Sequence, residues 1–141
     1  LVGLVEPLGF EGCALRHKAE AVEAIEALGA RGRVGLVHDT FHHHLAGGGP
    51  LFPEHTGLVH VSGVVEPSLG TEEMGDRHRV LVDARDRLGN LAQLRALEAA
   101  GWQGPVSVEC FAHEVHALAD PGGALRRSMA FLVEGTAREA A

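Results

Sequence analysis

Four short apolar segments of this sequence each contain near their end, or are followed by, a side chain that can bind a metal ion. In chain order, these side chains are Glu6, Asp39, His60 and Glu109. Three carboxylates and one imidazole offer mostly oxygen ligands, which suit Mn²⁺ or Mg²⁺, with Zn²⁺ and Co²⁺ as alternatives. If the chain brings these residues together, they form a site for one divalent metal ion.

Each of the four residues also has a simpler explanation. A carboxylate directly after a strand often caps the helix that follows, so Glu6, Asp39 and Glu109 could be helix caps. A histidine within an apolar strand, such as His60, is more often a hydrogen-bonded core residue than a ligand. Four such residues at the ends of four successive apolar segments nevertheless favour a shared site.

A histidine-rich stretch follows the second apolar segment. Residues 34–44 read Val-Gly-Leu-Val-His-Asp-Thr-Phe-His-His-His. His42 comes three positions after Asp39, which places both side chains at the opening of the same pocket. The alternative is a solvent-exposed cluster of His42, His43 and His44 that binds metal adventitiously. We expect that alternative to hold for His43.

The apolar segments themselves indicate the fold class. Residues 1–5, 34–37, 57–61 and 105–108 are almost continuously apolar and rich in Val and Leu, as in parallel strands that are covered on both faces. Helical patterns lie between them, and repeated strand–helix units predict a parallel α/β sheet, either doubly wound or a barrel. The carboxyl ends of parallel strands open on one face, so the four candidate ligands should converge there.

Three helices are expected from their apolar stripes and end signals. The first covers residues 17–30, with Val22, Ile25 and Leu28 on its apolar face. The second is capped by Asn90, with Leu91, Leu94 and Leu97 inward. The third starts at Asp120-Pro121, with Leu125, Met129 and Leu132 on one apolar stripe. The polar stretch from residue 64 to residue 86 is the expected active-site loop.

Composition narrows the classes of function. The net charge of −7 disfavours nucleic acid as a partner, and no apolar run approaches the roughly 20 residues that cross a bilayer. Cys13 and Cys110 form no metal or redox motif, so a cytosolic protein with reduced thiols is expected. The chain begins without Met on an apolar run and is short for a barrel of roughly 250 residues, which suggests missing upstream sequence.

Several of these motifs resemble a known family. Asp39-Thr-Phe-His42, the upstream Glu6, His60 at the end of a third strand, and Ser107-Val-Glu-Cys-Phe111 are similar to the xylose-isomerase-like TIM barrels. Within that group of sugar isomerases and epimerases, the pattern is nearest to the inosose (2-keto-myo-inositol) isomerases of inositol catabolism. The resemblance covers nearly the whole chain.

The resemblance implies a fold and an activity. Residues 1–141 would form one domain, the C-terminal half (strands five to eight) of a (β/α)8 barrel that lacks its N-terminal half or closes as a homo-oligomer. Glu6, Asp39, His60 and Glu109 would hold one divalent metal ion, with Glu6 and Glu109 as catalytic acid and base. His42 and Arg79 would contact the substrate, a small sugar or inosose. A dehydratase on the same scaffold, or a non-catalytic half-barrel, remains an alternative.

The sequence departs from the family pattern in two places beside the expected pocket. His60-Val-Ser-Gly63 lacks a carboxylate that the family often has three residues after this histidine, and Val82-Asp-Ala-Arg85 replaces a Pro-Gly-x-Gly turn. These changes leave the identity of the substrate open. The net charge counts against a further branch of the same barrel, the apurinic-site endonucleases.

Overall fold

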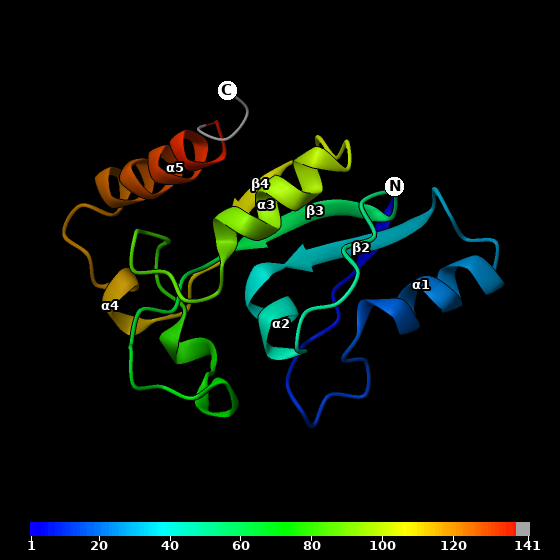
Figure 1. Ribbon diagram of the computed structural model, residues 1–141, viewed down its shortest axis with the longest axis horizontal. Helices are drawn as coiled ribbons and strands as arrows, with labels where there is room; N and C mark the ends of the chain where they lie inside the picture. The colour runs from blue at the N-terminus through cyan, green and yellow to red at the C-terminus, as the bar shows by residue number, and fades with distance from the viewer. Residues whose placement is uncertain (138–141) are drawn as a thin grey trace.

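A four-stranded parallel β-sheet lies at the centre of the fold (Figure 1). The computed structural model describes residues 1–137. The strands are adjacent in the sheet in the same order as in the chain: β1 (Gly3–Val5), β2 (Val34–Asp39), β3 (Thr56–Val61) and β4 (Val106–Val108). All three pairings are parallel. The four expected strands and the α/β class are therefore confirmed.

Helices alternate with the strands along the chain. They are α1 (Lys18–Ala27), α2 (Thr40–Leu45), α3 (Asn90–Ala99), α4 (His113–His116) and α5 (Pro121–Ala137), with short 3-10 turns at Thr71–Glu73 and Asp76–His78. The three expected helices correspond to α1, α3 and α5. The short helices α2 and α4 and both 3-10 turns were not expected, because each is too short for an apolar stripe to mark it.

The larger helices pack against one face of the sheet. Val59 and Val61 of β3 form a buried cluster with Leu94 and Leu97 of α3 and with Leu132 of α5. A second cluster joins Leu36 of β2 to Ala21 and Ile25 of α1. Sequential parallel strands with their crossover helices on one side are typical of a barrel wall rather than of a doubly wound sheet. The structure is half of a TIM barrel.

The expected cap of α3 is wrong. Asn90 is the first helical residue, and Gly89 occupies the cap position with a φ of 73°, in the left-handed region that favours glycine. The carboxylate of Asp86 accepts from the backbone N–H of Asn90 at 2.9 Å. The Asn90 side chain is fully buried and its Nδ2 donates to the Ser62 carbonyl at 2.8 Å. Asn90 thus ties α3 to the end of β3.

Two leucines expected in the core are exposed. Leu28 is 76% exposed because α1 ends at Ala27 and its buried stripe is made by Ala21 and Ile25. Leu125 is 41% exposed, since the face of α5 that packs inward in this part is formed by Ser128, which donates to the Val82 carbonyl at 2.8 Å. Both errors follow from where each helix meets the sheet, which helical periodicity does not specify.

The long connection from β3 to α3 folds back onto the sheet. The backbone of Gly63 and that of Val80 exchange hydrogen bonds of 2.7 and 2.9 Å in an isolated antiparallel bridge. Beneath the connection, Val64, Met74 and Leu88 pack against Phe41 and Leu45 of α2. These contacts hold Arg79 beside the carboxyl ends of the strands. In the part of the chain that the structure describes, no helix is both long and apolar enough to span a membrane.

Burial of Leu97 should be a main source of stability. Leu97 is fully buried against β3. We expect Leu97→Ala to lower the free energy of unfolding by about 2–5 kcal/mol, because it removes apolar contacts and leaves a cavity. Leu28→Ala is the matched control at an exposed site and should change it by less than about 0.5 kcal/mol. Equal effects of the two variants in urea unfolding would contradict the packing described here.

Candidate metal centre

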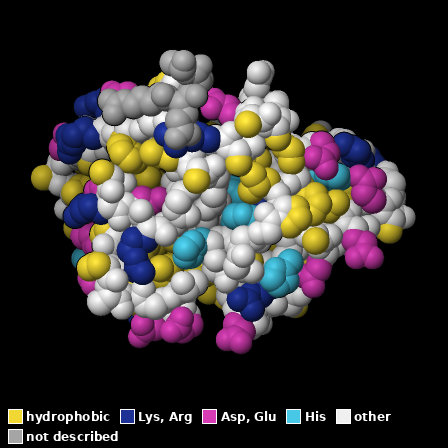
Figure 2. All heavy atoms as spheres, viewed as in Figure 1, with side chains coloured by type: hydrophobic (Ala, Val, Ile, Leu, Met, Phe, Trp, Pro, Cys, Tyr) yellow, Lys and Arg dark blue, Asp and Glu magenta, His cyan; other side chains and the backbone are white. Residues whose placement is uncertain are grey.

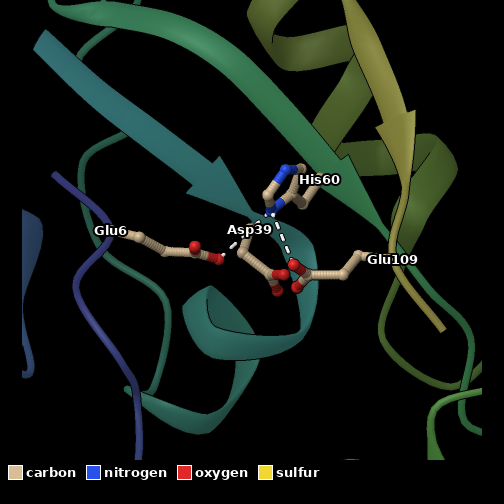
Figure 3. A group of neighbouring side chains, drawn as sticks. All are labelled: Glu6, Asp39, His60 and Glu109. Carbon is tan, nitrogen blue, oxygen red and sulfur yellow. Dashed lines mark hydrogen bonds and ion pairs between the residues drawn. The ribbon is translucent and has the colours of Figure 1, made fainter. Parts of the chain in front are cut away.

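The four candidate ligands meet at one edge of the sheet (Figure 3). Each of Glu6, Asp39, His60 and Glu109 offers a ligand atom, and these atoms all lie within 4.8 Å of one another. The Nδ1 atom of His60 is 3.3 Å from Oε1 of Glu6 and 3.5 Å from Oε1 of Glu109. Residues that are far apart in the sequence thus point toward a common centre.

Strand direction and alternation explain this convergence. Glu6 and Glu109 directly follow β1 and β4, and Asp39 is the last residue of β2. Within β3, Val59 and Val61 face the helices, so His60 between them points to the opposite face. Because all four strands run in the same direction, their ends lie at the same edge.

The set fits a divalent cation in donor chemistry and in size. A bond from a divalent ion to a nitrogen or carboxylate oxygen ligand is about 2.1 Å long. Two ligand atoms on opposite sides of the ion are therefore at most about 4.2 Å apart. Distances up to 4.8 Å therefore need only small side-chain rotations to close around one ion. Asp39 is buried, whereas Glu6, His60 and Glu109 are partly exposed, which leaves the centre open to a small molecule.

Asp39 caps a helix and also lies among the four candidate ligands. Its Oδ1 atom accepts hydrogen bonds from the backbone N–H groups of Phe41 at 2.8 Å and His42 at 2.9 Å, and so caps α2. Its Oδ2 atom accepts from Nη2 of Arg79 at 2.5 Å. The helix cap fixes the carboxylate in one orientation and leaves the second oxygen on the side of the other acidic residues.

Arg79 links two of the candidate ligands. It is only 1% exposed, and its Nη2 atom donates to Oε2 of Glu109 at 2.9 Å as well as to Asp39. A buried cation between two carboxylates offsets their mutual repulsion. Its guanidinium carbon also lies 4.8 Å from the ring centre of Phe41 and 5.1 Å from that of Phe111. Arg79 is therefore held rigidly beside the centre.

Two further partners of Arg79 were not foreseen. Its Nε atom donates to Oγ of Ser62 at 2.9 Å, and its Nη1 atom donates to Oδ1 of Asp76 at 3.4 Å. Ser62 belongs to the stretch in which the usual family carboxylate is missing, and its hydroxyl supplies an acceptor there. No sequence pattern joins Ser62 to Arg79, because their contact depends on the fold-back of the long connection.

Neighbouring charges and burial change two protonation equilibria at the centre. The pKa of Glu6 is raised, mainly by burial and then by the negative charges of Asp39 and Glu109. Burial lowers the pKa of His42, which favours its neutral form. His42 is 4% exposed, its ring lies edge-to-face with Phe10 at 5.1 Å, and its Nδ1 has no hydrogen-bond partner among residues 1–137.

The expectation of a solvent-exposed His43 is wrong. His43 is half-buried, and its ring lies 4.9 Å from that of the fully buried His38. Burial, with the nearby Lys18 and His44, lowers the pKa of His43 to about 4. The short helix α2, which was not expected, turns His43 toward α1 instead of toward solvent.

Removing a candidate ligand should weaken metal binding. We expect Glu109→Gln to lower the affinity for Zn²⁺ and Mn²⁺ at least tenfold, since even outer-shell partners of metal ligands typically contribute about 10–100-fold. Titration calorimetry and metal content after dialysis provide the measurement. Glu114→Gln, which changes an exposed carboxylate of α4, is the matched control and should bind like the parent protein.

Removing Arg79 should destabilise the metal-free protein. In Arg79→Met, the fully buried carboxylate of Asp39 loses its counter-charge, so the free energy of unfolding should fall by about 3–5 kcal/mol. Because a cation at the centre would supply that charge again, added Zn²⁺ should restore part of the loss in urea unfolding. Arg77→Met, at an exposed position, should have little effect. A variant as stable as the parent protein would show that Arg79 compensates no charge.

Comparison with known proteins identifies the fold family. Residues 1–134 match the family model described as xylose isomerase-like TIM barrel. A solved xylose isomerase domain containing protein from Salmonella typhimurium LT2 superposes with a TM-score of 0.86 at 32% sequence identity, over 94% of this chain and 51% of that one. A comparison with curated proteins gives no match.

Two other solved structures resemble the chain. A xylose isomerase domain protein from Alicyclobacillus acidocaldarius has a TM-score of 0.74 and 27% identity, over 99% of this chain and 52% of its own. The IolI protein, solved with a zinc atom, has a TM-score of 0.81 and 23% identity, over 98% of this chain and 50% of its own. The chain spans about half the length of these structures. By its family match and its half-barrel fold, the chain belongs to the xylose isomerase-like TIM barrels.

Proposed function

We propose that this protein acts in a divalent-metal-dependent isomerase or epimerase whose substrate is a small ketose, a polyol-derived ketone or an inosose. The observation that carries the proposal is the meeting of two glutamates, one aspartate and one histidine from four strands within 4.8 Å. The zinc atom in the structure of the similar IolI protein supports a divalent cation in such a barrel. Because the chain spans half of its relatives, the activity is proposed for the complete barrel.

The proposed metal ligands are Glu6, Asp39, His60 and Glu109. A divalent ion held by them would polarise the carbonyl and adjacent hydroxyl oxygens of a bound ketose, acidify the C–H between them and stabilise the enediolate. Mn²⁺ or Mg²⁺ suits the three carboxylates of this set, and the imidazole nitrogen of His60 also allows Zn²⁺ or Co²⁺.

Proton transfer is assigned to the two glutamates. Glu6 and Glu109 approach the centre from β1 and β4, the two outer strands of the sheet, and lie on either side of His60. A carbon acid bound between them would present its C–H to one carboxylate, and the other would return the proton at the neighbouring carbon or on the opposite face. Isomerisation and epimerisation differ in which of these two positions receives the proton.

Three other residues would orient the substrate. Arg79 fixes Asp39 and Glu109 through its Nη2 atom and presents a positive charge to the oxygens of the substrate. His42 is buried beside the centre, and its neutral ring can exchange a hydrogen bond with a substrate hydroxyl. Phe111, which is half-exposed over Arg79, would cover one side.

Two alternatives use the same residues. A dehydratase on this scaffold would form the same enediolate but expel a neighbouring hydroxyl, so product analysis with a panel of ketoses and inososes separates it from an isomerase. A half-barrel without activity would bind the metal ion but turn over no substrate. It would fold by association without completing an active pocket, whereas an active protein would close the barrel with a second half or a second copy.

Exchange of substrate hydrogen with solvent tests the proposal directly. In D₂O, incorporation of deuterium next to the carbonyl of a ketose or inosose should require added Mn²⁺ and should fall by at least about a hundredfold in Glu109→Gln, as expected for loss of a general acid or base. Glu114→Gln should exchange at the parental rate. Exchange that persists in Glu109→Gln would remove Glu109 from the mechanism, and binding of metal without any exchange would favour the inactive half-barrel.

A further inference from the structure

Lys18 occupies an unusual position for a lysine. It is the single lysine of the 141-residue sequence and begins α1, and its side chain turns inward instead of reaching into solvent. Its Nζ atom lies 2.6 Å from Nδ1 of His38 and 3.5 Å from the carbonyl oxygen of Leu51. Among residues 1–137, no carboxylate lies within ion-pair distance of Nζ. The amine therefore has no negative partner within the described chain.

The histidine beside Lys18 is a neutral acceptor. Nε2 of Gln93 donates to the carbonyl oxygens of Thr40 at 3.1 Å and Leu88 at 2.9 Å, which fixes the orientation of the amide. Oε1 of Gln93 then faces Nε2 of His38 at 2.8 Å, so this ring nitrogen carries the hydrogen. Nδ1 of His38 consequently has a lone pair, which accepts from Lys18 and supplies no charge.

A third basic group lies close to this pair. The ring of His43 is 4.9 Å from that of His38. Burial lowers the pKa of Lys18 to about 7, and burial together with the charge of Lys18 lowers the pKa of both histidines. Three basic side chains thus come together without a carboxylate to balance them.

A cavity of about 190 Å³ opens beside Lys18. Its charged and titratable lining consists of Arg16, His17, Lys18, His42, His43 and a single acid, Asp39. Both carboxylate oxygens of Asp39 are already engaged, one by the backbone at the start of α2 and the other by Arg79. Arg16 donates to the carbonyl oxygens of Gly9 and Leu45, which fixes its side chain at the wall. The cavity therefore combines several positive or polarisable groups with no available negative charge.

We propose that this cavity is an anion site that binds the oxyanion group of a small metabolite, a carboxylate or a phosphate monoester, on the ammonium group of Lys18 and the rings of His42 and His43. Lys18 has a donor to spare, since an ammonium carries three N–H groups and two acceptors are in place. Nδ1 of the buried His42 has no partner among the described residues. A water molecule takes about 30 Å³, so the cavity has room for a tetrahedral oxyanion.

The cavity adjoins the candidate metal centre: Asp39 lines the cavity and is a candidate ligand, and His42 lines the cavity and is also assigned to the substrate. The ammonium group of Lys18 repels a cation and both ring nitrogens of His38 are already engaged, so a second metal ion is not the expected occupant. Anion binding at Lys18 requires neither a metal ion nor turnover, and the inference therefore holds whether or not the protein is an isomerase.

The single lysine makes the test selective. In protein labelled with ¹³C at the lysine side chain, one ε-carbon signal reports Lys18. Sulfate and acetate, titrated separately, stay ionised between about pH 6 and pH 8, where an amine with a pKa of about 7 goes from mostly charged to mostly neutral. We expect a saturable shift of this signal, an increase in the Lys18 pKa, and about tenfold weaker binding at pH 8. The anion that binds more tightly identifies the group as phosphate-like or carboxylate-like.

Variants separate this site from other sources of binding. Titration calorimetry should show loss of anion binding in Lys18→Met but not in Arg31→Met, which removes an exposed positive charge outside the cavity. The Lys18 shift should persist in Glu109→Gln, which weakens the metal centre. A shift that grows linearly with anion concentration, or anion binding that survives in Lys18→Met, would overturn the proposal. If Lys18→Met folds poorly, the ε-carbon signal of Lys18 in the parent protein still shows whether the anion binds.

Discussion

Charge compensation among close carboxylates is the constraint on which the site depends. Glu6, Asp39 and Glu109 approach one point, and three negative charges at that separation would force the ends of the strands apart. Arg79 bridges two of them, and the imidazole of His60 faces the third. The pKa of Glu6 is raised first by burial and then by the negative charges of Asp39 and Glu109, and a divalent cation at this point would offset those charges.

The placement of Arg79 in turn depends on a small apolar cluster. The connection after β3 is polar in composition, yet it is held by Val64, Met74 and Leu88 packed on α2 and by the bridge between Gly63 and Val80. The same helix α2 is capped by Asp39. Burial of apolar side chains, capping of a helix and neutralisation of the centre are thus coupled. A substitution in the apolar cluster should therefore displace the candidate ligands even though it does not contact them.

The strands and the convergence of the four ligands could be predicted because both rest on local signals. A continuous apolar run predicts a buried parallel strand, and the residue that ends the run must lie at the open edge of the sheet. The roles of Asn90, Leu28 and Leu125 were predicted wrongly, since each depends on how a helix meets the sheet. The contacts of Arg79 with Ser62 and of Lys18 with His38 had no signal in the sequence, because they join segments through tertiary folding.

The alternation of β2 separates two electrostatic environments within consecutive residues. Asp39 points to the acidic centre, whereas His38 points to the helix layer and meets Lys18 and Gln93. Asp39 cannot act as a counter-ion for Lys18, because its oxygens are held by the α2 backbone and by Arg79. The protein therefore places the ammonium group of Lys18, which has no carboxylate partner in the described chain, near a group of carboxylates whose negative charge Arg79 offsets only in part. Such a separation costs free energy unless each side acquires an ion of opposite sign, a cation among the carboxylates and an anion beside Lys18.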